Sequence, residues 1–299
     1  MLASAFYSVL RHSGVVSVAR YTSNAGAILC YHNIVPYESS VGAPGLHLDV
    51  ERFHDQVEWV TRHFTVVPLS EYVRRLGRAH SLNRVLAITC DDGYQGVFSH
   101  AWPILRSFGL PVTVFVPTGL PAGDGFWWDG ESVVRCTTSD ERDRWLSEFD
   151  GDGERITRLM PGHQNGLSAD YRLASWSVMA DAAREGCEFG VHTHTHRNLT
   201  RLSDTDLRNE LVGSRAVLEE RTGQRITCLA YPYGLFDARV REAARAAGFE
   251  TAVTMDFGLN ALGADPLALR RINIPATIRA DAFQAWVCGL RPRVGESRS

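Results

Sequence analysis

The stretch Val85-Leu-Ala-Ile-Thr-Cys-Asp91-Asp92-Gly93-Tyr94 decides the fold that we predict for this chain. It is an apolar, β-branched run that stops at two adjacent carboxylates and a glycine, which is typical of a buried strand in a parallel sheet. Unpaired buried charge is costly, so two acids at the end of such a strand favour a functional site. The alternative is an Asp-Gly turn in which the second acid caps the following helix.

A second polar cluster, Val191-His192-Thr193-His194-Thr195-His196, also ends an apolar run. One Asp and two His are a typical ligand set for a divalent metal ion, and we predict Asp92, His192 and His196 as the ligands. A tight turn can point residues four apart at one ion, whereas a regular strand would place all three histidines on one face. We therefore expect His194 to point away. Three protein ligands leave one position open, which is typical of a catalytic zinc; Co²⁺ and Ni²⁺ are alternatives.

Predicted strands alternate with helices along the chain, which indicates an α/β barrel or a doubly wound sheet. The strands are expected at residues 27–32, 64–67, 85–90, 111–117, 187–192, 226–230, 251–254 and 267–274. Polar residues lie at the ends of several of these strands, among them His32, Asp91, His192, Tyr231 and Arg271. In a barrel such ends meet at one mouth, so we predict a barrel.

The predicted barrel spans residues 26–290 as a single domain. Residues 1–25 precede it, and Leu2, Phe6, Val9 and Leu10 recur there at the spacing of a short amphipathic helix. Residues 119–173 break the alternation, so we interpret them as an insertion that borders the site, with a helix near residues 140–149. Residues 291–299 are expected to form a flexible tail.

The composition excludes several function classes. The 299 residues carry a formal charge of −3 without a basic block, so nucleic-acid binding has no electrostatic support. All 31 basic residues are arginines, which excludes lysine Schiff-base chemistry. We expect no transmembrane segment, because no apolar run approaches the required length. Six scattered cysteines and the lack of a recognisable signal peptide favour buried thiols and a cytoplasmic location.

Three further positions carry candidate chemistry. Asp91 would remain as a general base beside the metal if Asp92 ligates it. The amide of Tyr233, in Tyr231-Pro232-Tyr233-Gly234, could stabilise an oxyanion, although an ordinary turn is the alternative. The paired aromatics Trp127 and Trp128 could form a wall for a sugar ring or anchor the insertion to the barrel.

His32 is the candidate general acid. The apolar strand before it delivers this histidine to the end where the other polar groups gather. An imidazole with its unperturbed pKa of roughly 6.5 suits proton donation to a leaving amine at neutral pH. The alternatives are a hydrogen bond to a loop carbonyl or an influence on a metal ligand.

Three motifs of the chain resemble those of the polysaccharide deacetylase (NodB-homology) family, the fourth carbohydrate esterase family. They are Thr89-Cys90-Asp91-Asp92-Gly93, residues 192–196 and Ala230-Tyr231-Pro232-Tyr233-Gly234, and the similarity runs from about residue 27 to 274. The resemblance implies a distorted (β/α)₇ barrel and metal-dependent removal of N-acetyl or O-acetyl groups from a sugar. It also implies that Asp91 is the base and that Asp92, His192 and His196 hold the metal.

The chain departs from the family pattern in three places. Cys90 replaces the usual phenylalanine, Tyr231 replaces an arginine that orients the base, and a Leu-x-His motif is missing near the C-terminus. The segments Leu29-Cys30-Tyr31-His32 and Leu269-Arg270-Arg271-Ile272 resemble a subgroup that acts on exopolysaccharides such as poly-N-acetylglucosamine. By this resemblance His32 and Arg271 supply the missing groups, and Arg271 is the cation beside Asp91.

The resemblance predicts an N-acetylated glycan as substrate, and two other functions remain open. A member of the same superfamily could cleave a small non-sugar amide, since pocket shape decides that choice. A catalytically inactive carbohydrate-binding barrel is the other alternative. A binding module needs no metal triad with a base, so the set of Asp91, Asp92, His192 and His196 argues against it.

Overall fold

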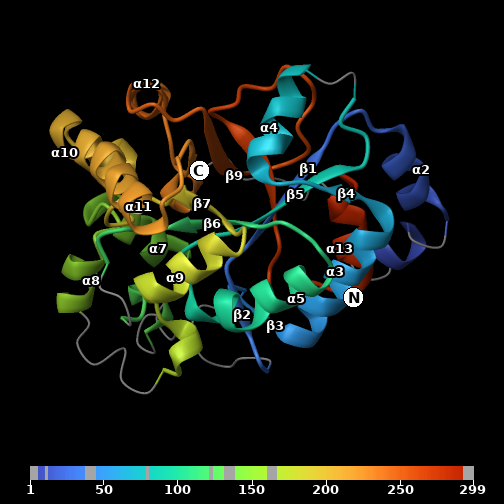
Figure 1. Ribbon diagram of the computed structural model, residues 1–299, viewed down its shortest axis with the longest axis horizontal. Helices are drawn as coiled ribbons and strands as arrows, with labels where there is room; N and C mark the ends of the chain where they lie inside the picture. The colour runs from blue at the N-terminus through green and yellow to red at the C-terminus, as the bar shows by residue number, and fades with distance from the viewer. Residues whose placement is uncertain are drawn as a thin grey trace.

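Seven parallel strands form a closed ring in the computed structural model of the chain (Figure 1). The residues described are 6–10, 13–37, 45–78, 81–120, 124–130, 139–159 and 167–291, without the side chains of 139–143. The ring strands are β1 (Ala27–Tyr31), β5 (Val85–Cys90), β6 (Thr113–Val116), β7 (Glu188–Val191), β8 (Cys228–Ala230), β9 (Thr251–Phe257) and β10 (Leu269–Asn273).

Pairing between β1 and β5 closes the ring, with Ala27 opposite Leu86 and Tyr31 opposite Cys90. The predicted distorted (β/α)₇ barrel is therefore confirmed. The expected strand at residues 64–67 is only β4 (Thr65–Val66), which pairs with β5 outside the ring. A separate parallel pair, β2 (Asn33–Val35) with β3 (His47–Asp49), was not predicted.

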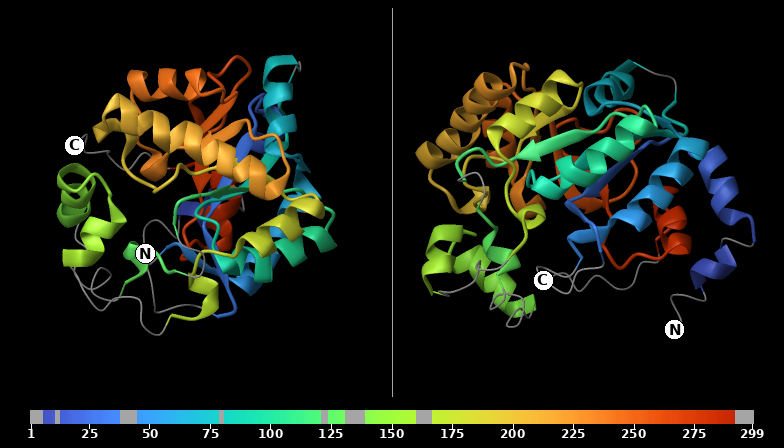
Figure 2. Two further views of the ribbon diagram at one scale, coloured as in Figure 1. Left: turned by 60° about the vertical axis from the view of Figure 1, so that its left-hand side comes forward. Right: turned by 60° about the horizontal axis from the view of Figure 1, so that its bottom comes forward.

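Helices surround the ring and cover the outward faces of its strands (Figures 1 and 2). They are α3 (Val50–His63), α5 (Trp102–Ser107), α9 (Trp176–Arg184), α10 (Asp204–Arg208), α11 (Ser214–Thr222), α12 (Ala238–Ala246) and α13 (Ala280–Val287). Helix α4 (Leu69–Arg78) instead packs Leu69, Tyr72 and Leu76 against the side chains inside the ring. In α3, for example, Phe53, Val57 and Val60 recur at helical spacing on the buried face, and the Asp49 carboxylate accepts two N–H bonds at the start of the helix. Among the described residues, no helix combines the length and apolar character needed to cross a membrane.

Side chains fill the inside of the ring. Six ring strands contribute residues to a single buried cluster, and these residues are Ile28, Val85, Ala87, Phe115, Cys228, Ala230, Val253 and Leu269. A Cβ at Gly190 would lie 2.4 Å from the Phe115 ring, so this position has no room for a larger residue. The inside of the barrel is therefore a packed core and not an open channel.

The insertion lies to one side of the barrel and carries α7 (Ser139–Glu148) and α8 (Gly153–Leu159) (Figures 1 and 2). Helix α7 corresponds closely to the helix predicted near residues 140–149. The two ends of the insertion are connected by an antiparallel bridge between Gly125 and Arg172, and a second bridge joins Leu173 to Tyr94. The insertion is thus anchored beside the end of β5.

The N-terminal segment differs from the single amphipathic helix that we expected. Residues 6–10 are helical, and α2 (Val15–Thr22) begins after Gly14, whose φ of +77° favours glycine and interrupts a helix. Phe6 and Val9 of the predicted apolar face are exposed, whereas Tyr7 is buried and its hydroxyl accepts a bond from the Trp286 indole N–H. Leu2 and residues 292–299 of the predicted tail lie outside the described residues.

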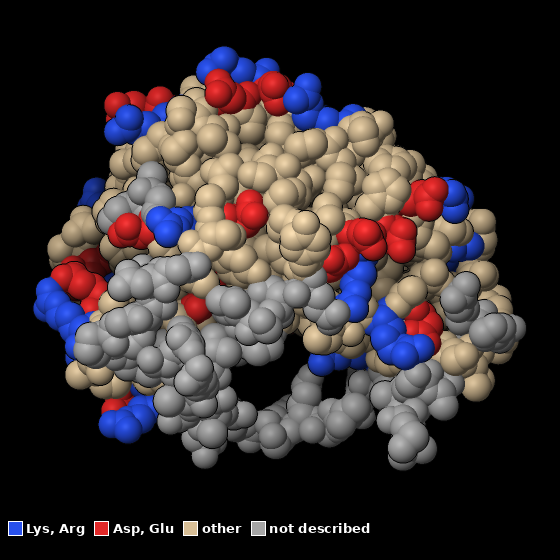
Figure 3. Space-filling model, turned by 90° about the horizontal axis from the view of Figure 1, so that it is seen from below, with Lys and Arg blue, Asp and Glu red and all other residues tan. Residues whose placement is uncertain are grey.

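Five of the six cysteines lie in the described residues, and all five are free and buried, as the sequence predicted. The sixth, Cys136, lies outside them. Acidic and basic side chains are interspersed on the described part of the face in Figure 3, which fits the small formal charge of −3.

Candidate metal centre and active site

The two carboxylates that follow β5 point to different partners. Asp92 and Gly93 both have positive φ, 71° and 69°, a conformation that is uncommon outside glycine but that aspartate adopts more readily than most residues. The chain therefore turns sharply, and Asp91 reaches Arg271 whereas Asp92 reaches His192 and His196. The Asp-Gly turn is present, but both carboxylates are only 2% exposed, and both contact polar side chains at the end of the barrel.

Asp92, His192 and His196 form a compact triangle of candidate ligand atoms. Asp92 Oδ1 lies 3.5 Å from His192 Nε2 and 3.4 Å from His196 Nε2, and the two imidazole nitrogens are 3.1 Å apart. Tetrahedral ligands about 2.0–2.1 Å from a zinc ion lie roughly 3.3 Å from one another. The three residues therefore fit a divalent cation, as the sequence predicted for this set.

A side-chain hydrogen bond orients His192, and the course of the backbone places His196. His192 Nδ1 donates to the carbonyl of Ala230 at 2.8 Å, which leaves Nε2 to face the ligand triangle. After β7 the chain curls through left-handed conformations at Thr193 and His196, and the His196 N–H donates to Thr193 Oγ1. This curl brings residues 192 and 196 together.

The Glu210 carboxylate holds the histidine loop, a role that the sequence did not reveal. It accepts the N–H groups of His194 and Thr195, both at 2.8 Å, and the Thr195 hydroxyl. The His194 ring lies against Gly119, and its Nδ1 is 3.1 Å from Thr118 Oγ1. His194 therefore stands apart from the ligand triangle.

The electrostatics of the triangle suit a cation. Burial, followed by the charges of Asp91 and Asp129, raises the pKa of Asp92 well above its usual value. Burial and then His192 lower the pKa of His196 well below its usual value. A bound divalent cation favours the ionised carboxylate and the neutral imidazoles, so it would relieve the cost that burial imposes on Asp92.

Arg271 is fully buried in the barrel and forms a bidentate pair with Asp91. Its Nη1 and Nη2 each donate to one carboxylate oxygen at 2.7 Å, and its Nε donates to the carbonyl of Thr254. Burial by itself would raise the pKa of Asp91, but the charge and hydrogen bonds of Arg271, together with His192 and His32, outweigh it and hold that pKa well below its usual range. Asp91 is therefore ionised at neutral pH.

His32 lies between β1 and β2 and is half-buried. Polar atoms of His32, Cys30 and Asp91 lie within 4.8 Å of one another, and His32 Nδ1 has no hydrogen-bond partner among the described residues. Burial lowers the pKa of His32 to about 4, against the opposing charge of Asp91. The expectation of an unperturbed imidazole was therefore wrong, because the side chain is removed from water.

Tyr233 contributes its side chain to the site as well as its backbone. Its φ is +60°, its ring lies at 79° to the His196 ring with centroids 4.7 Å apart, and its hydroxyl donates to the carbonyl of Gly151 in the insertion. The oxyanion role of its amide stays a prediction.

A cavity of about 780 Å³ adjoins the ligand triangle between the insertion and the histidine loop. Trp128 and His196 both line it, and their ring centroids are 4.8 Å apart. Trp127 is 9% exposed and packs against Ile156 and Trp145 of the insertion. Trp127 also lines the cavity, but it is mostly buried in the insertion, whereas Trp128 contacts the ring of His196.

The profile of the polysaccharide deacetylase family matches residues 79–252, more than half of the chain. The chain belongs to the polysaccharide deacetylase family. YxkH of Bacillus subtilis (strain 168), a relative named as a polysaccharide deacetylase, is 21% identical over 87% of this chain and 75% of its own length. A poly-β-1,6-N-acetyl-D-glucosamine N-deacetylase of Staphylococcus aureus (strain MRSA252) is 20% identical over 73% of this chain and 68% of its own.

Solved structures share the barrel of this polysaccharide deacetylase family member. The Streptococcus pyogenes deacetylase PplD, solved with acetate, has a TM-score of 0.64 at 18% identity and covers 90% of this chain and 99% of its own. IcaB from Ammonifex degensii also has a TM-score of 0.64, at 21% identity, and covers 89% and 97%. At such identities these structures support the fold alone.

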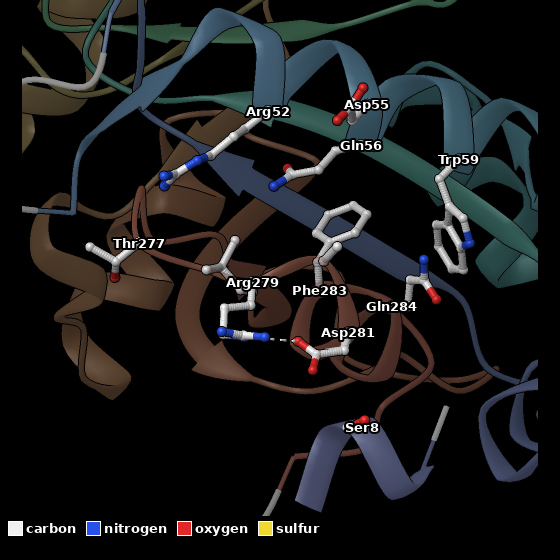
Figure 4. Close-up of a pocket in the computed structure, with 12 residues that line it drawn as sticks. Ser8, Arg52, Asp55, Gln56, Trp59, Thr277, Arg279, Asp281, Phe283 and Gln284 are labelled. Carbon is white, nitrogen blue, oxygen red and sulfur yellow. Dashed lines mark ion pairs between the residues drawn. The ribbon is translucent and has the colours of Figure 1, made fainter. Parts of the chain in front are cut away.

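A second hollow, of about 550 Å³, lies between α3, α13 and the helical residues 6–10 (Figure 4). Arg279 and Asp281 form an ion pair across part of it at 3.5 Å. None of the predicted site residues lines this hollow.

Proposed function

We propose that this polysaccharide deacetylase family hydrolase removes acetyl groups from N-acetylated amino sugars in a poly- or oligosaccharide, with a divalent metal as cofactor. The observation that carries the proposal is the ligand triangle of Asp92, His192 and His196 beside the Asp91–Arg271 pair. The name of the Staphylococcus aureus relative supports a glycan of the poly-N-acetylglucosamine type.

Zinc is the metal that we propose. Two imidazole nitrogens and one carboxylate oxygen, spaced 3.1 to 3.5 Å apart, suit its tetrahedral coordination, and Co²⁺ or Ni²⁺ are the nearest substitutes. When bound, the cation polarises the acetamide carbonyl and lowers the pKa of a water molecule.

Asp91 and His32 would together move the proton that the reaction requires. Asp91 is ionised and accepts a proton at a carboxylate oxygen as general base. The pKa of Asp91 is held well below its usual range and that of His32 is about 4, so the proton is more stable on His32. We propose that His32 then delivers it to the departing amine, while the Tyr233 amide stabilises the oxyanion.

Acetate release tests the substrate class. We expect the purified protein to release acetate from N-acetylglucosamine oligomers, β-1,6-linked ones included, far faster than from a panel of small linear and cyclic amides. Preferential hydrolysis of a small amide would replace the glycan proposal. Binding of the oligomers without any acetate release from the metal-loaded protein would indicate a carbohydrate-binding barrel.

The two tryptophans are expected to give opposite results. Trp128→Ala should raise KM for the oligomers roughly tenfold or more and leave the melting temperature nearly unchanged, because the Trp128 ring borders the cavity in contact with His196. Trp127→Ala should lower the free energy of unfolding by about 3 to 5 kcal/mol, the usual range for a buried tryptophan. Kinetics and thermal unfolding of both variants check this. A raised KM in Trp127→Ala at an unchanged melting temperature would contradict it.

A further inference from the structure

Five polar side chains from separate segments form one continuous hydrogen-bond chain, which we call the Asp129 network. Its members are Asn33 of β2, His47 of β3, Tyr94 after β5, and Trp128 and Asp129 of the insertion. Four links join them: Asn33 Nδ2 to His47 Nδ1 at 3.1 Å, His47 Nε2 to Asp129 Oδ1 at 2.8 Å, Tyr94 Oη to Asp129 Oδ2 at 2.7 Å, and Trp128 Nε1 to Tyr94 Oη at 2.8 Å.

The direction of each hydrogen bond follows from what its groups can donate. The Trp128 indole only donates, so the Tyr94 oxygen accepts from it and gives its own proton to Asp129. Asn33 Nδ2 also donates to the carbonyl of Asp170 at 3.0 Å, which identifies it as the amide nitrogen. His47 Nδ1 therefore accepts, and Nε2 donates to Asp129. Asp129 accepts at both oxygens and is a carboxylate.

One end of the network contacts the candidate ligand His196, and the other end is next to His32 in the sequence. At one end, the Trp128 ring stacks on the Phe126 ring, with centroids 4.8 Å apart, and also contacts the ring of the metal-ligand candidate His196. At the other end, Asn33 directly follows His32 in the sequence. Asn33, His47, Tyr94 and Asp129 are at most 4% exposed, so they do not contact a bound glycan themselves.

We propose that Tyr94 and Asp129 are positioning residues that fix the Trp128 indole as the wall of the glycan site beside His196. The proposal rests on the proposed function for the nature of the ligand. A wall that is held before the glycan arrives loses no side-chain freedom on binding, so its affinity is higher than that of a mobile indole. Without the Tyr94 hydroxyl, the indole N–H loses its acceptor and the ring loses this restraint.

A double-mutant cycle tests whether Tyr94 acts through Trp128. Tyr94→Phe should raise KM for N-acetylglucosamine oligomers roughly tenfold, which corresponds to about 1.4 kcal/mol, with kcat within about threefold of the wild type. In a Trp128→Phe background, which lacks the indole N–H, the same Tyr94→Phe change should leave KM within about twofold. Equal effects of Tyr94→Phe in both backgrounds would overturn the proposal.

Two further variants separate positioning from a general loss of structure. Asp129→Asn should raise KM in the same direction as Tyr94→Phe, since its amide keeps only one acceptor oxygen for two donors, the Tyr94 hydroxyl and His47 Nε2. Tyr72→Phe is the matched control, because Tyr72 is also a fully buried tyrosine but belongs to the cluster around α4. A KM increase in Tyr72→Phe as large as that in Tyr94→Phe would overturn the proposal.

A readout without substrate keeps this proposal distinct from the proposed function. The emission of Trp128 is obtained by subtracting the spectrum of Trp128→Phe, and its quenching by acrylamide reports how well the indole is held. We expect the quenching constant to rise about twofold in Tyr94→Phe, because an indole that is held less firmly is more accessible to acrylamide. Unchanged quenching overturns the positioning role, whereas a wild type without acetate release but with the expected quenching overturns only the proposed substrate.

Discussion

His196→Ala is expected to abolish both metal binding and acetate release. Its Nε2 is one corner of a ligand triangle whose sides measure 3.1 to 3.5 Å, and two remaining ligands cannot hold the ion in place. Asp92→Ala should behave in the same way. The metal content after dialysis measures the first loss, and the rate of acetate release measures the second. Chelation of the wild type should remove activity, and Zn²⁺, Co²⁺ or Ni²⁺ should restore it.

His194→Ala is the matched control for this prediction. Its ring lies against Gly119 and Thr118, outside the triangle, so the variant should keep its metal. If His194→Ala lost the metal while His196→Ala retained it, the ligand assignment would be wrong. Activity in the wild type after exhaustive chelation would reject metal dependence altogether.

His32→Ala should retain its metal and fold while kcat on the amide falls by roughly two to four orders of magnitude, the usual range for one acid–base group. An amine leaves a tetrahedral intermediate poorly unless it is protonated, and His32 is the imidazole next to Asp91 outside the ligand triangle. p-Nitrophenyl acetate should be largely spared, because its leaving phenolate needs no proton. The measurement is the factor by which kcat falls on the amide, divided by the factor by which it falls on the ester.

Equal losses on the two substrates would reject the acid role of His32. Metal content should be measured in the same samples, because a histidine that acts through a metal ligand would change it. A normal metal content with a loss confined to the amide is the result that supports the proton pathway through Asp91 and His32.

The ring of strands and the ligand triangle were predictable because their signals are local. Apolar runs such as Val85–Cys90 end abruptly at polar residues, and in a parallel barrel those ends meet. His192 and His196 are four residues apart in the sequence. One tight turn can bring them together, so this part of the site was predictable without any contact between distant segments. The position of Arg271 beside Asp91 was expected only from the resemblance to a family subgroup.

The Asp129 network was not predictable because its members are far apart in the sequence and lie on short elements. His47 and Asp129 are 82 residues apart, and β3, which carries His47, has only three residues. The sequence showed an aromatic pair beside Asp129, but not the strand that supplies its partner. Likewise, the pKa of His32 depends on how deeply its side chain is buried, and the sequence around it does not reveal this.

The place of β10 in the ring has a consequence for protein synthesis. β10 lies between β1 and β9, and its Arg271 is 180 residues away from Asp91. A chain emerging from the ribosome presents its N-terminal strands first, so β1 and β9 each lack a neighbour until β10 is made. Asp91 lacks its guanidinium over the same period. We therefore expect closure of the barrel and pairing of Asp91 with its guanidinium to occur together, and a nascent chain interrupted before β10 to have neither.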